Sequence, residues 1–129
     1  MGNAYRQLLL EILDINKEAW EQQDPQKILT IFLEDAIYHE RVLEKPMRGH
    51  NEIAQYWQNK VVEGQRDIKF KLLNLYIDAP TAIAEWEVFF LDTVQGVNRH
   101  MKEVAILDIE AGKIRALREY WACEILEKI

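Results

Sequence analysis

Apolar residues in the first part of the chain recur every three or four positions, the spacing that places them along one side of a helix. This stripe consists of Leu8, Leu9, Ile12, Leu13, Ile15, Ala19 and Trp20. Asp24 followed by Pro25 is typical of a helix N-terminus, because aspartate accepts backbone N–H hydrogen bonds and proline fits the first helical position. The pattern predicts a long first helix and a short second one, with Phe32 on the apolar side of the second.

A short strand and a third helix are expected next. Residues 36–42 favour a strand with Tyr38 and Glu40 near its centre. Asn51 is a suitable cap for a helix that extends to about Val62. One strand is therefore expected among the three helices.

From Asp67 onward the apolar period changes to two, as in strands that bury one face. Later strands are expected over residues 82–92, 101–109 and 113–123. Helices followed by four antiparallel strands predict an α+β roll, in which three N-terminal helices pack against a curved, mostly antiparallel sheet. A sheet that curves around helices leaves a hollow in which a ligand can bind.

The last two strands are expected to form a hairpin with the three-residue loop Glu110-Ala111-Gly112, because glycine suits the left-handed last position of such a loop. This register pairs Ile109 with Lys113, Ala105 with Leu117, Glu103 with Glu119, and Met101 with Trp121. If Glu103 and Glu119 are buried, one of them must hold a proton, share it or meet a cation. The alternatives are a register slipped by one residue, or a water-facing side on which both glutamates are harmless.

Composition and charge narrow the class of protein. A chain of 129 residues that is 49% hydrophobic and has four tryptophans is expected to form one packed domain over residues 1–129. The net charge of −6 argues against a nucleic-acid partner, and no apolar run approaches the ~20 residues of a membrane span. Cys123 is the single cysteine, so no internal disulfide can form and a cytoplasmic location is expected.

Three segments resemble landmarks of a known superfamily: residues 19–40, residues 47–57 and residues 111–121. Their order is similar to that in the nuclear transport factor 2-like superfamily, and more narrowly in its SnoaL-like branch. That branch includes polyketide cyclases and is related to ketosteroid isomerase and limonene epoxide hydrolase. The resemblance implies one SnoaL-like domain over residues 1–129, with a cystatin-like, cone-shaped roll, a pocket inside the cone and a homodimer.

The resemblance carries over to the site only in part. Ketosteroid isomerase has a carboxylate base on its first strand, which the match places at Glu40, but its two oxyanion partners match Asn16 and Ala105, so steroid isomerisation is poorly supported. Glu119 resembles the late acid of limonene epoxide hydrolase, whose arginine has no counterpart in residues 84–88. Ala122 stands where the SnoaL-like branch often has an aspartate.

The candidate catalytic residues are Glu40, Glu103 and Glu119, because a partly apolar cone raises carboxyl pKa values towards those of general acids and bases. The candidate ligand-binding residues are Asn16, Phe32, Trp57, Glu87, Met101 and Trp121. The strand expected over residues 82–92 leaves two orientations open. Either Glu85 and Glu87 face inward, so that the row of Trp86, Val88 and Phe90 needs a second subunit to cover it, or this apolar row faces inward and the two glutamates meet solvent.

Two functions of different classes follow. The first is a cofactor-independent acid–base enzyme, an isomerase, cyclase or hydrolase, acting on a small apolar molecule in the cone. The alternative is a non-catalytic domain that binds a ligand or forms a homodimer through its outer sheet face. No metal site or cofactor is expected, because His39, His50 and His100 are far apart in the sequence and no phosphate-binding loop occurs.

Overall fold

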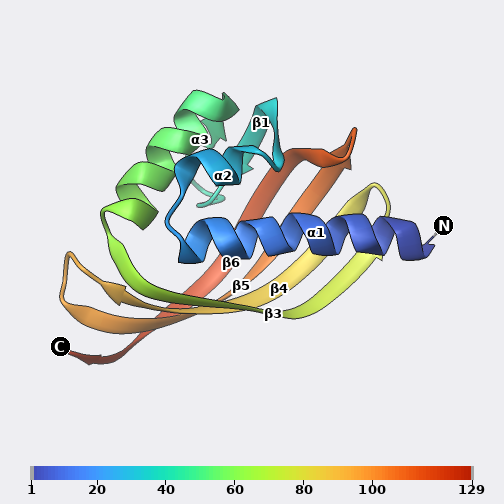
Figure 1. The fold of residues 1–129 in the computed structure, drawn as a ribbon. Coiled ribbons are helices and arrows are strands. Elements are labelled where there is room, and N and C mark those ends of the chain that lie inside the picture. The colour runs from blue at the N-terminus through green and yellow to red at the C-terminus, as the bar shows by residue number, and fades with distance from the viewer. Residues whose placement is uncertain (1, 129) are drawn as a thin grey trace.

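The chain folds into helices packed against one curved sheet (Figure 1), and the computed structural model describes residues 2–128, with side chains for residues 3–126. The helices are α1 (Gly2–Glu21), α2 (Pro25–Leu29) and α3 (Gly49–Trp57), and α3 continues into a π-helical segment, η1 (Gln58–Val62). The strands are β1 (Phe32–His39), β2 (Met47–Arg48), β3 (Gln65–Asp78), β4 (Thr81–Asp92), β5 (Val97–Glu110) and β6 (Lys113–Lys128).

The sheet has the strand order β2-β1-β6-β5-β4-β3. The β1–β6 pair is parallel and every other neighbouring pair is antiparallel. Irregular pairing places extra residues in β1, β3 and β6 and bends these strands, because a bulge adds a residue to one strand without adding one to its partner. The predicted α+β roll of three helices on a mostly antiparallel sheet is confirmed.

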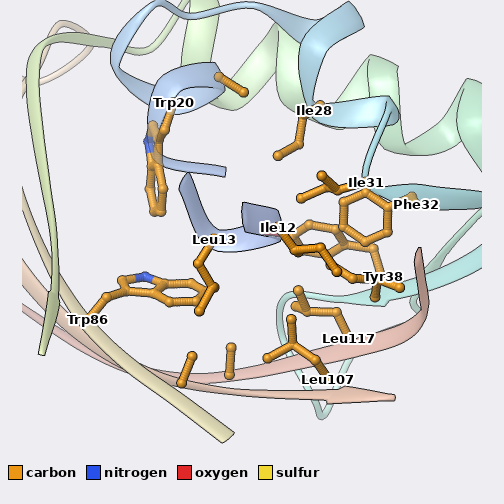
Figure 2. Close-up of a cluster of buried hydrophobic side chains, with 14 of the residues drawn as sticks. Ile12, Leu13, Trp20, Ile28, Ile31, Phe32, Tyr38, Trp86, Leu107 and Leu117 are labelled. Atoms are coloured by element: carbon orange, nitrogen blue, oxygen red, sulfur yellow. The ribbon is translucent and has the colours of Figure 1, made fainter. Parts of the chain in front are cut away.

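Helix α1 lies along the concave side of the sheet (Figure 1) and supplies one side of the core. Figure 2 shows Ile12, Leu13 and Trp20 facing residues of the sheet, among them Trp86 of β4 and Leu107 of β5. The indole rings of Trp20 and Trp86 meet edge to face, with centroids 6.4 Å apart, a geometry that the aromatic quadrupoles favour. Packing against the sheet therefore explains the helical stripe in the sequence.

Helix α2 begins as predicted but ends earlier. The Asp24 side chain accepts hydrogen bonds from the backbone N–H groups of Gln26 and Lys27 at 3.0 and 3.1 Å, a cap that contributes about 1 kcal/mol. The prediction that Phe32 belongs to the apolar side of this helix is wrong, because Phe32 is the first residue of β1 and pairs with Ile114 of β6.

Helix α3 begins two residues before the predicted cap at Asn51. Its first residue is Gly49, whose φ of +80° suits glycine because a Cβ is unfavourable in the left-handed region. The carboxylate of Glu52 accepts the backbone N–H of Arg48, the N-cap residue, at 2.9 Å, and no side chain caps the N–H groups of the first turn as was expected of Asn51.

The β5–β6 hairpin differs from its predicted register by two residues. Its turn has two central residues, Ala111 and Gly112, with φ of +52° and +76°, and a bulge lies between Asp108 and Ile109. Observed partners are Glu103 with Trp121, Ala105 with Glu119, and Met101 with Cys123. Since side-chain direction alternates with a period of two, this even shift keeps the two glutamates on one face as diagonal neighbours.

Strand β4 turns its apolar row inward. Trp86, Val88 and Phe90 are buried, and the ring of Trp86 packs against Trp20 of α1 and Phe70 of β3. The orientation with inward-facing Glu85 and Glu87 is therefore wrong, because the apolar stripe of α1 needs apolar partners on this strand. Along the described part of the chain, no helix combines the length and apolar character needed to cross a membrane.

Candidate functional site

A cavity of about 370 Å³ lies between the concave face of the sheet and the α3–η1 segment. Side chains from every long strand and from α1, α3 and η1 contribute to its wall. Six residues that the sequence predicted for the site line this cavity: Glu40, Trp57, Met101, Glu103, Glu119 and Trp121. Their placement together makes the cavity the candidate site, while their roles in binding or catalysis stay predictions.

Three predicted site residues lie elsewhere. Asn16 is buried on α1 and Phe32 is buried at the start of β1, where its ring packs against Tyr38, and neither contributes to the cavity wall. Glu87 is on the opposite face of the sheet, where its carboxylate contacts His100 Nε2 at 2.8 Å. The prediction that Glu87 faces the pocket is wrong, because the neighbouring apolar row takes the inward positions of β4.

Glu103 of β5 and Glu119 of β6 form a buried carboxyl pair. They are 3% and 5% exposed, which removes the water that would stabilise two negative charges. Burial raises the pKa of Glu103 to about 7; a hydrogen bond within the pair and the nearby Trp86 indole oppose this rise, and the charge of Glu40 adds to it. Burial, followed by the charge of Glu103, raises the pKa of Glu119 well above its ordinary value. Because two buried negative charges side by side repel each other, loss of the first proton from the pair makes the second harder to remove.

Two tyrosines surround this pair. The Tyr38 hydroxyl donates a hydrogen bond to Glu119 Oε2 at 3.1 Å, and the Tyr38 and Tyr56 rings have centroids 5.5 Å apart. Burial, followed by the charge of Glu119, raises the pKa of both phenols well above 10, so both stay neutral donors. A neutral phenol holds the Glu119 carboxyl in place without adding charge.

Glu40 lies just beyond the end of β1 and has different partners. Its Oε2 accepts the Trp121 indole N–H at 2.9 Å, and its Oε1 is 3.5 Å from the Nε atom of Arg41. The Arg41 guanidinium also lies over the Trp121 ring, 5.5 Å from the ring centroid. Glu40 is thus paired with a cation, whereas Glu103 and Glu119 are paired with each other.

Several buried polar atoms near the site have no hydrogen-bond partner. Glu103 Oε2 has no donor, and the indole N–H of Trp57 has no acceptor, although both residues line the cavity. The Trp86 indole N–H makes no hydrogen bond either, although Trp86 is paired with Glu103 across β4 and β5 and its indole favours the charged form of that carboxyl. The Asn16 side-chain nitrogen is unpaired in the core. Leaving such a group unsatisfied costs about 1–3 kcal/mol, and it is a cost that a ligand can remove.

The tyrosines are the site residues that sequence reasoning missed. Tyr38 stands two residues before Glu40, so strand alternation already placed both on one face. Tyr56 precedes Trp57 on α3, and no pattern in the sequence indicates that this side of the helix also meets the cavity. Among residues 2–128, no cluster of three or more His, Cys, Asp or Glu side chains has the arrangement of a metal site.

Structural comparison gives the same fold at low sequence identity. A hypothetical protein with a ketosteroid isomerase-like fold from Catenulispora acidiphila, in complex with trimethylamine, has a TM-score of 0.75 and 16% identity over 85% of this chain and 84% of that one. TsrD from Streptomyces laurentii has a TM-score of 0.77 and 14% identity over 90% and 89%. An LEH-like epoxide hydrolase from M. tuberculosis has a TM-score of 0.73 and 13% identity over 90% and 84%.

Sequence comparison identifies the family. No curated protein matches the chain significantly. The family model described as the SnoaL-like domain matches residues 16–117, which covers most of the chain. The match includes α2, α3 and Glu103 of β5 and ends two residues before Glu119. The resemblance inferred from the three sequence segments is thereby confirmed, and the chain belongs to the SnoaL-like domain family.

Proposed function

We propose that this protein binds a small, largely apolar molecule in its cavity and moves a proton on it without a cofactor, as an isomerase, cyclase or hydrolase does. The observation that carries the proposal is the Glu103–Glu119 pair, a buried acid and base side by side on the cavity wall. A pKa of about 7 for Glu103 suits a general base, because proton transfer is most effective when the pKa lies near the working pH.

The unequal surroundings of the three glutamates assign their roles. Glu103 takes the substrate proton, because its Oε2 has no hydrogen bond to break. Glu119 is protonated at the start and donates its proton to another atom of the substrate, while a hydrogen bond from Tyr38 holds the Glu119 carboxyl in place. Glu40, which is hydrogen-bonded to Trp121 and close to Arg41, provides a fixed negative charge on the cavity wall that helps to anchor the substrate. The proton gained by Glu103 then passes to Glu119 and restores the pair.

Deuterium incorporation into simple carbonyl compounds tests this proposal. Small ketones, enones and lactones are incubated with the protein in D₂O, and loss of C–H signal is followed by proton NMR. We expect exchange in at least one compound, and a decrease of about 10²-fold or more in Glu103→Gln. Glu87→Gln, on the opposite face of the same sheet, is the matched control and should retain the wild-type rate.

Carbon-13 NMR titration of the glutamate side chains can contradict the acid–base proposal. If Glu103 and Glu119 both titrate near ~4.3, as in model peptides, the acid–base proposal is wrong. Equal exchange rates in wild type, Glu103→Gln and Glu119→Gln would contradict it independently.

A non-catalytic ligand-binding role is the second candidate. It is favoured by Asn16 and Ala105, which match the oxyanion positions of ketosteroid isomerase but offer no acidic hydrogen bond, and by Ala122, which stands where the SnoaL-like branch often has an aspartate. Asn16 also does not line the cavity. The two roles separate experimentally, because a binding protein shows ligand-induced shifts in the cavity resonances without any deuterium incorporation.

We also propose that two copies of the chain associate through the outer sheet face. Exposed apolar side chains there support this assembly: Tyr76 (59% exposed), Ile83 (38%), Phe89 (39%) and Tyr120 (47%). Sedimentation equilibrium should give a dimer that Tyr120→Glu weakens. Leu43→Glu, at a fully exposed loop position, is the control, and a monomer at every concentration tested would contradict the proposal.

A further inference from the structure

The Glu103–Glu119 pair has no positively charged partner among the side chains that the structure describes. No Lys, Arg or His nitrogen lies within ion-pair distance of either carboxyl among the side chains of residues 3–126. Two other carboxylates of the cavity wall do have such partners: Asp92 contacts Arg99 Nε at 2.8 Å and Glu40 contacts Arg41. Buried charge in proteins is ordinarily paired, so this pair is the exception in the wall.

The same pair also carries the unpartnered oxygen. Glu103 is 3% exposed, lines the cavity and presents Oε2 without a donor. A carboxylate oxygen accepts hydrogen bonds only, so the group that satisfies it must be a donor. Because the pair becomes an anion when it loses its first proton, a donor that is itself positively charged gains most from this position.

Aromatic rings add to the attraction for a cation. Tyr38, Tyr56, Trp57 and Trp121 all line the cavity, and the face of each ring attracts positive charge. The chain already uses this combination once, where the Arg41 guanidinium lies over the Trp121 ring and beside Glu40. At the carboxyl pair the acids and rings are present, but of the cations that line the cavity (Arg41, Lys60 and Arg99) none lies within 4.0 Å of either carboxyl.

We propose that the cavity binds a protonated amine, whose ammonium N–H donates to Glu103 Oε2 and whose hydrocarbon part packs among the aromatic rings. This inference rests on the proposed function only in that the cavity takes a small molecule. A volume of about 370 Å³ lies within the range of small-ligand pockets. An ammonium group fits better than a bare metal ion, because it needs one acceptor and ring faces instead of several oxygen ligands.

Three probes of similar shape and different charge test the inference: benzylamine, benzyl alcohol and benzoate. Binding to the full chain is measured at about pH 8 by amide chemical-shift changes, with isothermal titration for dissociation constants. We expect benzylamine to bind at least about tenfold more tightly than benzyl alcohol, a preference of about 1.4 kcal/mol, and benzoate to bind least. The comparison uses the wild-type protein, so it does not depend on any variant folding.

Substitutions test whether the preference for benzylamine depends on the Glu103–Glu119 pair. Glu103→Gln and the double variant Glu103→Gln/Glu119→Gln should lose the tenfold preference for the amine while retaining the weaker binding of the alcohol. Glu87→Gln keeps its position on the outer face and should retain the preference. Amide spectra of each variant establish that it is folded.

The contrary outcomes are specific. Equal or tighter binding of benzyl alcohol overturns the amine inference while leaving a small-molecule pocket in place. An amine preference that survives the double variant, or no binding of any probe, also overturns it. The acid–base step is tested separately by deuterium incorporation, so either proposal can fail while the other stands.

Discussion

The sheet brings two glutamates together on each of its faces, with opposite consequences. On the inner face, Glu103 and Glu119 meet each other in a buried position without a cation. On the outer face, Glu87 of β4 and Glu124 of β6 flank His100, with contacts of 2.8 Å to Nε2 and 2.9 Å to Nδ1. The two arrangements lie on opposite sides of the same sheet, so secondary structure does not explain their difference.

The difference lies in burial and in the partner. Inside, burial favours the neutral form and raises the pKa of a carboxyl group, so the pair stores a proton. Outside, hydrogen bonds to Glu124 and Glu87 favour the charged form and raise the pKa of His100 above 6.5. In this sheet the carboxyl pKa is therefore raised towards neutral pH where the side chains are buried and have no cation beside them.

The largest expected effect is the pH dependence of stability that the inner pair causes. A carboxyl whose pKa rises from 4.5 to about 7 on folding binds a proton in the native state that the unfolded chain has lost, so stability falls as pH rises through that window. The shift corresponds to roughly 3 kcal/mol. Urea unfolding at about pH 5 and about pH 8 should show this loss in wild type, and Glu103→Gln should reduce it. Parallel profiles for the two proteins would contradict the buried pair.

Removal of the Tyr38 hydroxyl tests how the pair is held. Tyr38→Phe leaves Glu119 Oε2 without its donor, which should lower the free energy of unfolding by about 1–3 kcal/mol. It should also raise the pKa of Glu119 further, because the hydrogen bond from Tyr38 lowers that value. Tyr120→Phe is the matched control, since Tyr120 is next in sequence to Glu119 but points to the opposite, exposed face. Equal losses in the two variants would show that the Tyr38 hydrogen bond contributes nothing.

Alternation predicted that Glu103 and Glu119 share one face, but it left open whether that face meets the cavity or water, and the register could not be predicted. Glu103, Glu119 and Trp121 alternate with exposed residues, and their inward direction survives any even shift in pairing. The pairing depends on whether the turn has two or three central residues. A two-residue turn needs a positive φ at Ala111, which could not be expected from an alanine. Glu40 was assigned to the site from the family resemblance, because it matches the carboxylate on the family's first strand, and it lines the same cavity.

The errors at the site arise from packing between distant segments. Glu87 was assigned to the pocket because β4 alternates equally well in either direction, and only contact with Trp20 of α1 decides that Trp86 faces inward. Phe32 was assigned to a helix because its local sequence continues the stripe of α2, whereas pairing with Ile114, far along the chain, makes it a strand residue. Such contacts are not encoded in any short window of sequence.

The outer arrangement predicts a smaller effect in a higher pH range. His100 contributes stability while it is protonated, fully so below the pKa of the unfolded chain, and this contribution is lost as pH rises through the raised native pKa. We expect about 1 kcal/mol or less, because Glu124 is 64% exposed and exposed ion pairs contribute little. His100→Gln should therefore flatten the unfolding profile only above about pH 6.5. A profile that changes between pH 5 and 6 would assign the effect to other groups.

Salt gives the smallest and most discriminating effect. At about 1 M sodium chloride the Debye length is about 3 Å, so charges in contact with solvent are screened while buried ones are screened much less. The pKa of His100 should fall towards 6.5 by a few tenths, because the Glu124 side of its contact is open to water. The pKa of Glu103 should stay at about 7, because desolvation by the protein, which salt does not reverse, raises it. NMR titration of both groups in one sample makes each the control for the other. A salt-dependent Glu103 would mean that water and ions reach the pair, and the contrast between the two faces would then be one of degree.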